Sequence, residues 1–235
     1  TASVSIDQDR QNIKNPTDFE FPEDGINIRW PDGPVDQEKR LISVKLKAAQ
    51  AFVRFNKLDR ISHAVSKKRL GIVAPGKAWL NVCQAFDELD LNEFERKDMG
   101  IGVFKVAMPW PLEPSRIRDW AKGFEEIIVI EEKRNLIEDQ LARVIYDLPE
   151  TERPRLIGKY DIDGNLLVPE FGELNGTLIA QIIANRFLDE GNDNCLTKAA
   201  ATVKARTADT NRPVAPSERS PWFCAGCPHN SSTKV

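Results

Sequence analysis

Leu70-Gly71-Ile72-Val73-Ala74-Pro75-Gly76 is the stretch that decides the fold. It is a short apolar run that ends in a Pro-Gly pair, and a helix-like segment over residues 77–89 follows directly. Short apolar runs rich in β-branched residues, when they alternate with helices, are typical of strands buried on both faces of a sheet. The stretch therefore predicts the first strand–helix unit of an α/β fold.

The same order of strand and helix repeats along the chain. The further predicted strands are residues 101–107, 126–130 and, from a weaker pattern, 155–158. The helices predicted after them lie near residues 115–122, 135–146 and 175–188, the last one behind a hairpin turn at Asp163-Gly164-Asn165. We expect an α/β domain over residues 35–190, with a mostly parallel sheet and helices on both of its faces.

The segments outside this pattern differ in composition. Residues 1–34 are polar and rich in proline, and we expect an extended linker lying over a surface. Its apolar residues are the expected anchors: Phe19, Phe21, Ile26, Ile28 and Trp30. From Asp36 to Arg60 there is no Gly or Pro, and apolar residues recur at steps of three and four, which predicts an amphipathic helix. Residues 191–220 lose this periodicity and read as a second linker before a final segment, residues 221–235.

Composition excludes several classes of protein. The 235 residues are 41% hydrophobic and 29% charged, with a formal net charge of −3, which is ordinary for a soluble globular protein. This balance offers no basic face for nucleic acid, and no apolar run is long enough for a transmembrane helix. We expect the first residues to be neither a signal peptide nor a natural start. Four cysteines in a chain of this length do not make a disulfide framework, so we expect a reducing cytoplasm.

The carboxyl ends of the predicted strands are the expected functional loops, because ligands and partners of such sheets bind there. The loop Pro109-Trp110-Pro111-Leu112-Glu113-Pro114 is either a stiff connection with Pro114 near a helix start, or a rigid loop that presents Trp110 and Glu113 to a partner domain or cofactor cleft. Glu131-Glu132-Lys133 either marks the edge of a site or caps the next helix. Asn175 is a candidate N-cap of the last helix.

Several well-known site motifs do not occur. Gly71 and Gly76 do not form the glycine pattern of dinucleotide-binding folds, and the sequence holds no P-loop, no nucleophile elbow and no H-E-x-x-H motif. His63 has no neighbour at metal-ligand spacing, and we expect it to have no functional role.

The strongest chemical signal is Pro221-Trp222-Phe223-Cys224-Ala225-Gly226-Cys227-Pro228-His229. Gly226 allows the tight turn by which Cys224 and Cys227 can reach one metal ion, or each other. A tetrahedral site needs four ligands, and this stretch offers two, or three with His229, so it resembles half of a site. Zinc, a redox dithiol and an iron–sulfur site are all compatible with the spacing. The dithiol is less favoured, because the motif follows a linker and precedes Pro228.

These residues resemble a known family. Residues 219–230, from Arg219 to Asn230, resemble the entry to the thiamine-diphosphate domain of indolepyruvate ferredoxin oxidoreductases, in the 2-oxoacid:ferredoxin oxidoreductase superfamily. Four further stretches resemble the long, fused-subunit form of these enzymes: residues 27–32, 108–114, 130–133 and 172–175. The resemblance covers essentially the whole chain in matching order.

The resemblance implies a role for each part. The α/β domain would correspond to a domain like the transketolase C-terminal domain, and residues 1–34 would link it to an upstream pyrimidine-binding domain. Residues 221–235 would begin the diphosphate-binding domain, where Cys224 and Cys227 would be two ligands of a 4Fe–4S cluster whose other ligands lie past Val235. The full enzyme, expected to be a cytoplasmic homodimer, would use thiamine diphosphate and Mg²⁺.

By the same resemblance, the substrates would be coenzyme A and a 2-oxo acid, above all indolepyruvate or another aryl pyruvate. The reaction would be an oxidative decarboxylation to an acyl-CoA, with ferredoxin as the electron acceptor. This chain lacks the family's diphosphate motif, pyrimidine-domain glutamate and ferredoxin module, so we expect no catalytic residue in it and no turnover by it alone. The alternative is a non-catalytic α/β interaction module whose C-terminal tail binds zinc and dimerises through it.

Overall fold

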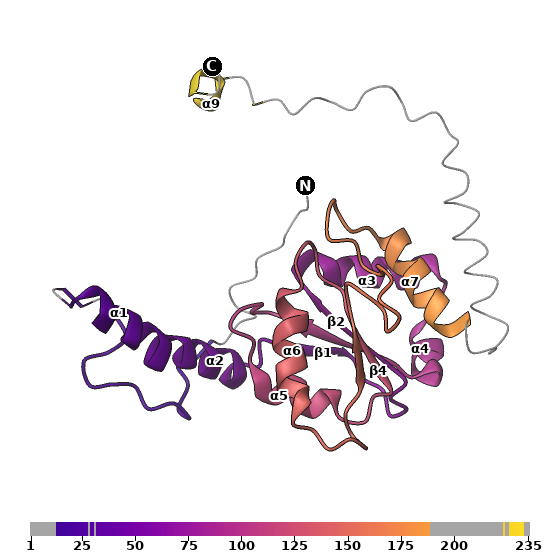
Figure 1. Ribbon diagram of the computed structural model, residues 1–235, viewed down its shortest axis with the longest axis horizontal. Coiled ribbons are helices and arrows are strands. Elements are labelled where there is room, and N and C mark those ends of the chain that lie inside the picture. The colour runs from indigo at the N-terminus through magenta and orange to yellow at the C-terminus, as the bar shows by residue number, and fades with distance from the viewer. Residues whose placement is uncertain (1–12, 28, 31, 189–222, 224–225, 233–235) are drawn as a thin grey trace.

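A computed structural model describes residues 13–27, 29, 30, 32–188, 223 and 226–232. Its main body is a sheet with helices on both faces (Figure 1). The second predicted linker, residues 191–220, lies outside the described residues. None of the helices in the described ranges combines the length and apolar character needed to cross a membrane.

The sheet has five strands in the order β1-β3-β2-β4-β5. Their bounds are Arg60–His63 for β1, Leu70–Pro75 for β2, Ile101–Val106 for β3, Glu126–Val129 for β4 and Arg155–Ile157 for β5. Strands β2 to β5 run parallel, and β1 pairs antiparallel with β3 at one edge. The predicted α/β class with a mostly parallel sheet is confirmed. The edge strand β1 was not predicted, and the prediction that the preceding helix runs as far as Arg60 was wrong.

Helices cover the two faces of the sheet as separate layers. Helices α3 (Gly76–Glu88) and α7 (Gly176–Leu188) lie on one face, and α5 (Pro114–Ala121) and α6 (Leu136–Tyr146) lie on the other (Figure 1). The short α4 (Glu93–Met99) leads into β3. The predicted N-cap is confirmed: Asn175 Oδ1 accepts a hydrogen bond from the Leu178 N–H at 2.9 Å.

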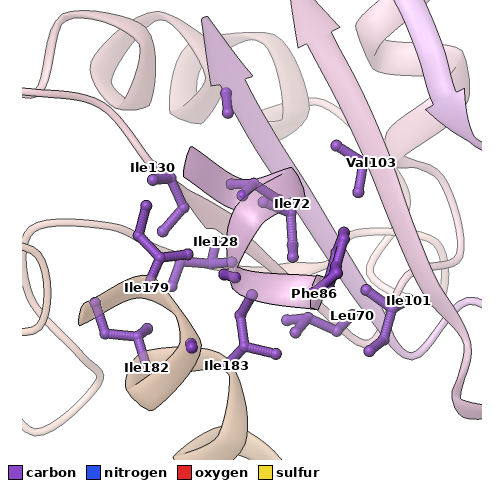
Figure 2. Packing of buried hydrophobic residues seen from close by; sticks show 14 of the residues in the cluster. Leu70, Ile72, Phe86, Ile101, Val103, Ile128, Ile130, Ile179, Ile182 and Ile183 are labelled. Atoms are coloured by element: carbon purple, nitrogen blue, oxygen red, sulfur yellow. The ribbon is translucent and has the colours of Figure 1, made fainter. Parts of the chain in front are cut away.

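Each central strand contributes side chains to the cores on both faces of the sheet, because successive side chains of a strand point to opposite faces. On β2, Ile72 packs into the core shared with α3 and α7, and Val73 packs into the core shared with α5 and α6. Figure 2 shows the first of these cores, where Ile72 and Ile128 from the strands meet Ile183 of α7. This double burial explains why the strands read as continuous apolar runs.

Two glycines lie side by side where aromatic rings press on the sheet. Gly71 of β2 is in register with Gly102 of β3. A Cβ atom on Gly71 would lie 2.9 Å from the Trp120 ring, and one on Gly102 would lie 2.7 Å from the Phe124 ring. The missing side chains therefore make the space in which α5 and the turn after it pack on the sheet.

An arm, defined here as residues 34–55, projects from the body (Figure 1). It is a helix in three parts, α1 (Pro34–Arg40), the π-helical segment η2 (Leu41–Lys45) and α2 (Leu46–Phe55), and it confirms the helix predicted in this region. It ends before a left-handed residue, Lys57, at φ 51°.

Two ion pairs join the segment before the arm to the arm itself. Asp18 pairs with Arg54 at 3.0 Å, and Asp24 pairs with Arg40 at 2.8 Å. The prediction that Trp30 anchors this segment was wrong, because its side chain is 91% exposed. Phe21 and Ile26 are each 39% exposed, and Ile28 lies outside the described residues.

Candidate functional site

The carboxyl edge of the sheet is the place where the sequence predicted functional loops. A cavity of about 670 Å³ opens there, and its walls come from the ends of β2 and β4, the loop after β3 and the start of α6. It is lined by Pro75, Pro109, Glu131, Glu132, Lys133, Arg134, Asn135, Leu136, Ile137 and Asp139. Its character depends on which of these polar groups already have partners inside the protein.

Glu131 turns inward and caps α6. Its carboxylate accepts hydrogen bonds from the Ile137 N–H at 2.9 Å and from the Glu138 N–H at 3.0 Å, and its side chain is only 4% exposed. Burial raises the pKa of Glu131, and these two backbone N–H groups oppose that rise. An anionic ligand would otherwise favour the positive end of this helix. That position is taken by the protein's own carboxylate.

Lys159, which follows β5, is buried against Glu131. Its Nζ donates to the carbonyl oxygen of Glu131 at 2.5 Å and to that of Pro169 at 3.4 Å, and the residue is 1% exposed. Burial lowers the pKa of Lys159, and the charges of Glu131 and Glu138 oppose that change. Sequence reasoning missed Lys159, because a lysine in a polar stretch reads as a surface residue.

The proline-rich loop joins the same edge. Glu113 is fully buried and caps α5, accepting from the Ser115 N–H at 3.2 Å and the Arg116 N–H at 3.1 Å. Pro114 is the first residue of that helix, which confirms the stiff strand-to-helix connection. The alternative, in which the loop presents Glu113, was wrong for that residue. Trp110 is 55% exposed and is presented on the surface.

Gln140 of α6 fixes the shape of this loop. Its Oε1 accepts from the Leu112 N–H at 2.8 Å, and its Nε2 donates to the Pro109 carbonyl oxygen at 2.8 Å. From the arm, Gln50 donates to the Leu112 carbonyl oxygen at 2.8 Å. The loop is therefore held by side chains from two sides, and the Trp110–Pro111 peptide within it is cis.

A buried carboxylate lies behind the loop. Asp59 is 1% exposed, and its Oδ1 accepts from the Ala107 N–H at 2.7 Å. Its Oδ2 has no hydrogen-bond partner among the described residues. Burial raises the pKa of Asp59, the Ala107 N–H opposes that rise, and the charge of Glu113 adds to it. The burial of Asp59 could not be predicted from the sequence, because an aspartate in front of a strand is normally a surface residue.

The start of α3 is tied to the segment before α7. Lys77 pairs with Glu173 at 2.8 Å and donates to the Leu174 carbonyl oxygen at 2.9 Å. Asn81 donates to that same carbonyl oxygen at 2.8 Å. These contacts give the stretch around Glu173 a structural role at the carboxyl edge.

The C-terminal motif is described only in part. Cys224 lies outside the described residues, so the pairing of Cys224 with Cys227 stays a prediction. Cys227 is half-buried, and its Sγ lies 3.3 Å from Nδ1 of His229, next to Gly226 at φ +82°. His229 opens the short α9 (His229–Ser232), and its ring stacks on Phe223 with centroids 5.4 Å apart.

Within the ranges that the structure describes, no group of three or more His, Cys, Asp or Glu side chains is arranged to hold a metal ion. His63 is half-buried, with Nδ1 3.0 Å from the Ser62 hydroxyl, and burial lowers its pKa. The buried acids and the buried lysine at the carboxyl edge bond to other parts of the chain, so they stabilise the fold. The thiol of Cys227 is the described side chain best suited to bind a soft metal.

The indolepyruvate oxidoreductase domain family matches residues 60–210, which include the whole sheet and the helices that cover it. This chain belongs to that family. The resemblance to indolepyruvate oxidoreductases drawn from short stretches is confirmed at the level of this domain.

Curated relatives agree. The indolepyruvate oxidoreductase subunit IorA of Methanothermobacter marburgensis is 24% identical over 194 residues, covering 82% of this chain and 26% of the subunit. The same subunit of Methanothermobacter thermautotrophicus is 24% identical over 219 residues, covering 89% of this chain and 30% of the subunit. The chain thus spans about a quarter to a third of the length of these relatives. Among solved structures, a split-gene transketolase, described as an inactive β4 tetramer, aligns at 16% identity with a TM-score of 0.34, over 63% of this chain and 41% of its own.

Proposed function

We propose that this chain is the central, non-catalytic domain of a thiamine-diphosphate-dependent indolepyruvate:ferredoxin oxidoreductase. The full enzyme would convert a 2-oxo acid, indolepyruvate or another aryl pyruvate, and coenzyme A into an acyl-CoA and carbon dioxide, and pass the two electrons released to ferredoxin. The observation that supports this most is the family match across residues 60–210, because it covers every strand of the sheet.

The geometry of the carboxyl edge supports a scaffolding role. Helices α5 and α6 begin at the edge where a cofactor phosphate would bind, and the chain's own Glu113 and Glu131 cap them. The described residues therefore offer the diphosphate no cradle at these two helix ends. Thiamine diphosphate and its Mg²⁺ are expected on neighbouring domains, and no step of the reaction is assigned to side chains of this domain.

The C-terminal motif would be the chain's contribution to electron transfer. Cys224 and Cys227 would supply two thiolate ligands to a 4Fe–4S cluster, and such a cluster accepts and passes on single electrons. The half-buried Sγ of Cys227 beside the imidazole of His229 suits a metal-binding thiol. The domain limits inferred from sequence form part of this proposal: the α/β domain over residues 35–190, the linkers 1–34 and 191–220, and the cluster segment 221–235.

The test is an assay of the natural enzyme that contains this sequence, purified without oxygen. We expect reduction of ferredoxin that depends on both indolepyruvate and coenzyme A, with smaller aliphatic 2-oxo acids as poorer substrates. The isolated 235-residue chain should show no turnover. An enzyme that reduces ferredoxin with no 2-oxo acid at all would refute the proposed reaction. Bound zinc without iron would favour the interaction module with a zinc-binding tail.

A further inference from the structure

Cys227 and His229 contact one another through their side chains. The Sγ atom of Cys227 lies 3.3 Å from Nδ1 of His229, close enough for a hydrogen bond to sulfur. Cys227 is half-buried, whereas the histidine is exposed. The proposed function assigns a role to this thiol but none to the imidazole.

The backbone between the two residues holds them together. Gly226 is left-handed at φ +82° and turns the chain directly before Cys227. Pro228 keeps its own φ near about −65° because of its ring, and it precedes the first residue of α9. The Asn230 N–H then donates to the Cys227 carbonyl oxygen at 3.0 Å. A tight turn, closed by this bond, therefore brings the imidazole back to the sulfur.

A second ring fixes the plane of the imidazole. Phe223 stacks on His229 with ring centroids 5.4 Å apart and an angle of 24° between the planes. Stacked aromatic rings attract one another beyond the area that they bury. The stack restricts rotation of the His229 ring, so Nδ1 stays on the side of Cys227.

The described donor fits the cluster of the proposed function. Thiolates are the usual protein ligands of 4Fe–4S clusters, and Cys227 supplies one. The turn that carries it is not crowded, because a Cβ atom on Gly226 would have no atom within 4 Å. The thiol and its turn are therefore compatible with a bulky metal group.

The chemistry of a bound thiolate sets the direction of the hydrogen bond. A cysteine binds metal as the thiolate, which has no proton and can only accept. A neutral imidazole carries its proton on one of its two ring nitrogens. With metal on Cys227, the proton of His229 therefore lies on Nδ1, and the ring is the donor. An N–H aimed at a ligand sulfur draws electron density from it, which favours the reduced form of a cluster.

We propose that His229 is a positioning residue for the proposed cluster, whose reduction it favours by donating a hydrogen bond from Nδ1 to the sulfur of Cys227. The inference rests on the proposed function, because it takes Cys227 to be a cluster ligand. It concerns the reduction potential of that cluster, whereas the proposed function concerns its presence and the substrates of the enzyme.

The test is a redox titration, followed by electron paramagnetic resonance, of the natural enzyme that contains this sequence and of two variants, all purified without oxygen. The signal followed is that of the cluster that Cys227→Ser removes. His229→Phe keeps a ring that can stack on Phe223 but removes the donor. His229→Asn loses the ring but keeps an amide N–H near the position of Nδ1.

We expect His229→Phe to lower the equilibrium constant for one-electron reduction about tenfold, which is a fall of about 59 mV in midpoint potential. His229→Asn should stay much closer to the natural enzyme. Iron and labile sulfide should be unchanged in both variants, because the histidine is not a ligand.

An unchanged midpoint potential in His229→Phe overturns the inference and leaves the proposed cluster standing. An equal fall in both variants also overturns it, because loss of the native ring and not loss of the donor would then be the cause. Loss of iron from His229→Phe overturns it by making the histidine a ligand. A natural enzyme without a cluster at Cys227 overturns the inference together with the proposed role of that thiol.

Discussion

Lys159 donates a hydrogen bond from its Nζ to the backbone carbonyl oxygen of Glu131 at 2.5 Å, and both side chains are almost completely buried. The two residues come from opposite sides of one corner of the carboxyl edge. Glu131 follows β4 and caps α6, and Lys159 follows β5. Glu138 of α6 completes the corner, because its carboxylate accepts from the Lys159 N–H at 3.0 Å. The corner that holds ligands in many α/β sheets is here occupied by contacts within the chain.

Removing the cap should cost stability. We expect Glu131→Ala to lower the free energy of unfolding by about 2–4 kcal/mol, because two buried N–H groups of α6 lose their acceptor and Lys159 loses a nearby negative charge. The neighbouring Glu132→Ala is the control. Its side chain is 34% exposed, and its ion pair with Lys77 is long, at 3.5 Å. The loss in the free energy of unfolding should therefore stay below about 0.5 kcal/mol. Urea unfolding measures both, and equal losses would contradict the assigned role of Glu131.

The buried carboxylate of Asp59 predicts a dependence on pH. Its pKa is raised in the folded state, so its contribution to stability is fully present below the unfolded pKa of about 3.9 and is lost as pH rises through the folded value. Asp59→Asn cannot ionise. Its stability relative to the natural chain should therefore improve between about pH 4 and about pH 7.

The control for this prediction has the opposite sign. The pKa of Asp161 is lowered, because the backbone N–H of Asn165 donates to its carboxylate. The stability that Asp161 contributes is present above the unfolded pKa of about 3.9 and is lost as pH falls through the lower folded value. The stability of Asp161→Asn relative to the natural chain should therefore fall as pH rises from about 3 to about 5, and change little from there to about pH 7. Unfolding is measured from about pH 3 to about pH 7, and a rise in relative stability of Asp161→Asn like that of Asp59→Asn would show that Asp59 does not titrate as described.

The paired glycines of the sheet predict a steric effect. Gly102→Ala places a methyl group 2.7 Å from the Phe124 ring, and we expect a loss of about 1–3 kcal/mol in the free energy of unfolding. Phe124→Leu in the same chain should recover part of that loss, so that the double variant is more stable than the sum of the single changes predicts. Strict additivity would mean that the close approach of Phe124 is not what excludes a side chain at Gly102.

The strands could be predicted where burial on both faces left an unbroken apolar run. Residues 70–74 and 127–130 are of this kind, and strands β2 and β4 lie there. Strand β1, Arg60–His63, carries no such run, because it is a short edge strand with Arg60 and Ile61 exposed. Helix α4 was not predicted for a related reason: it buries no residue and is defined by its capping box between Asn92 and Glu95.

The sequence predicted where the candidate site lies, but not which of its side chains are buried. Strand order directs attention to the carboxyl edge, but sequence does not tell which acids turn inward. Glu113 and Glu131 were both considered, and capping was one of two alternatives for the Glu131 stretch. Asp59 and Lys159 gave no signal, because their burial depends on contacts far along the chain, to Ala107 and to Glu131.

Metal analysis of the natural enzyme, purified without oxygen, tests the central claim most directly. We predict that Cys227→Ser removes the iron and labile sulfide of one cluster per chain, while the fold of the α/β domain, followed by circular dichroism, is unchanged. Cys83→Ser is the matched control, because Cys83 is a half-buried thiol on α3, and its iron content should equal that of the natural enzyme. Full iron content in Cys227→Ser, or zinc in place of iron, would contradict the account.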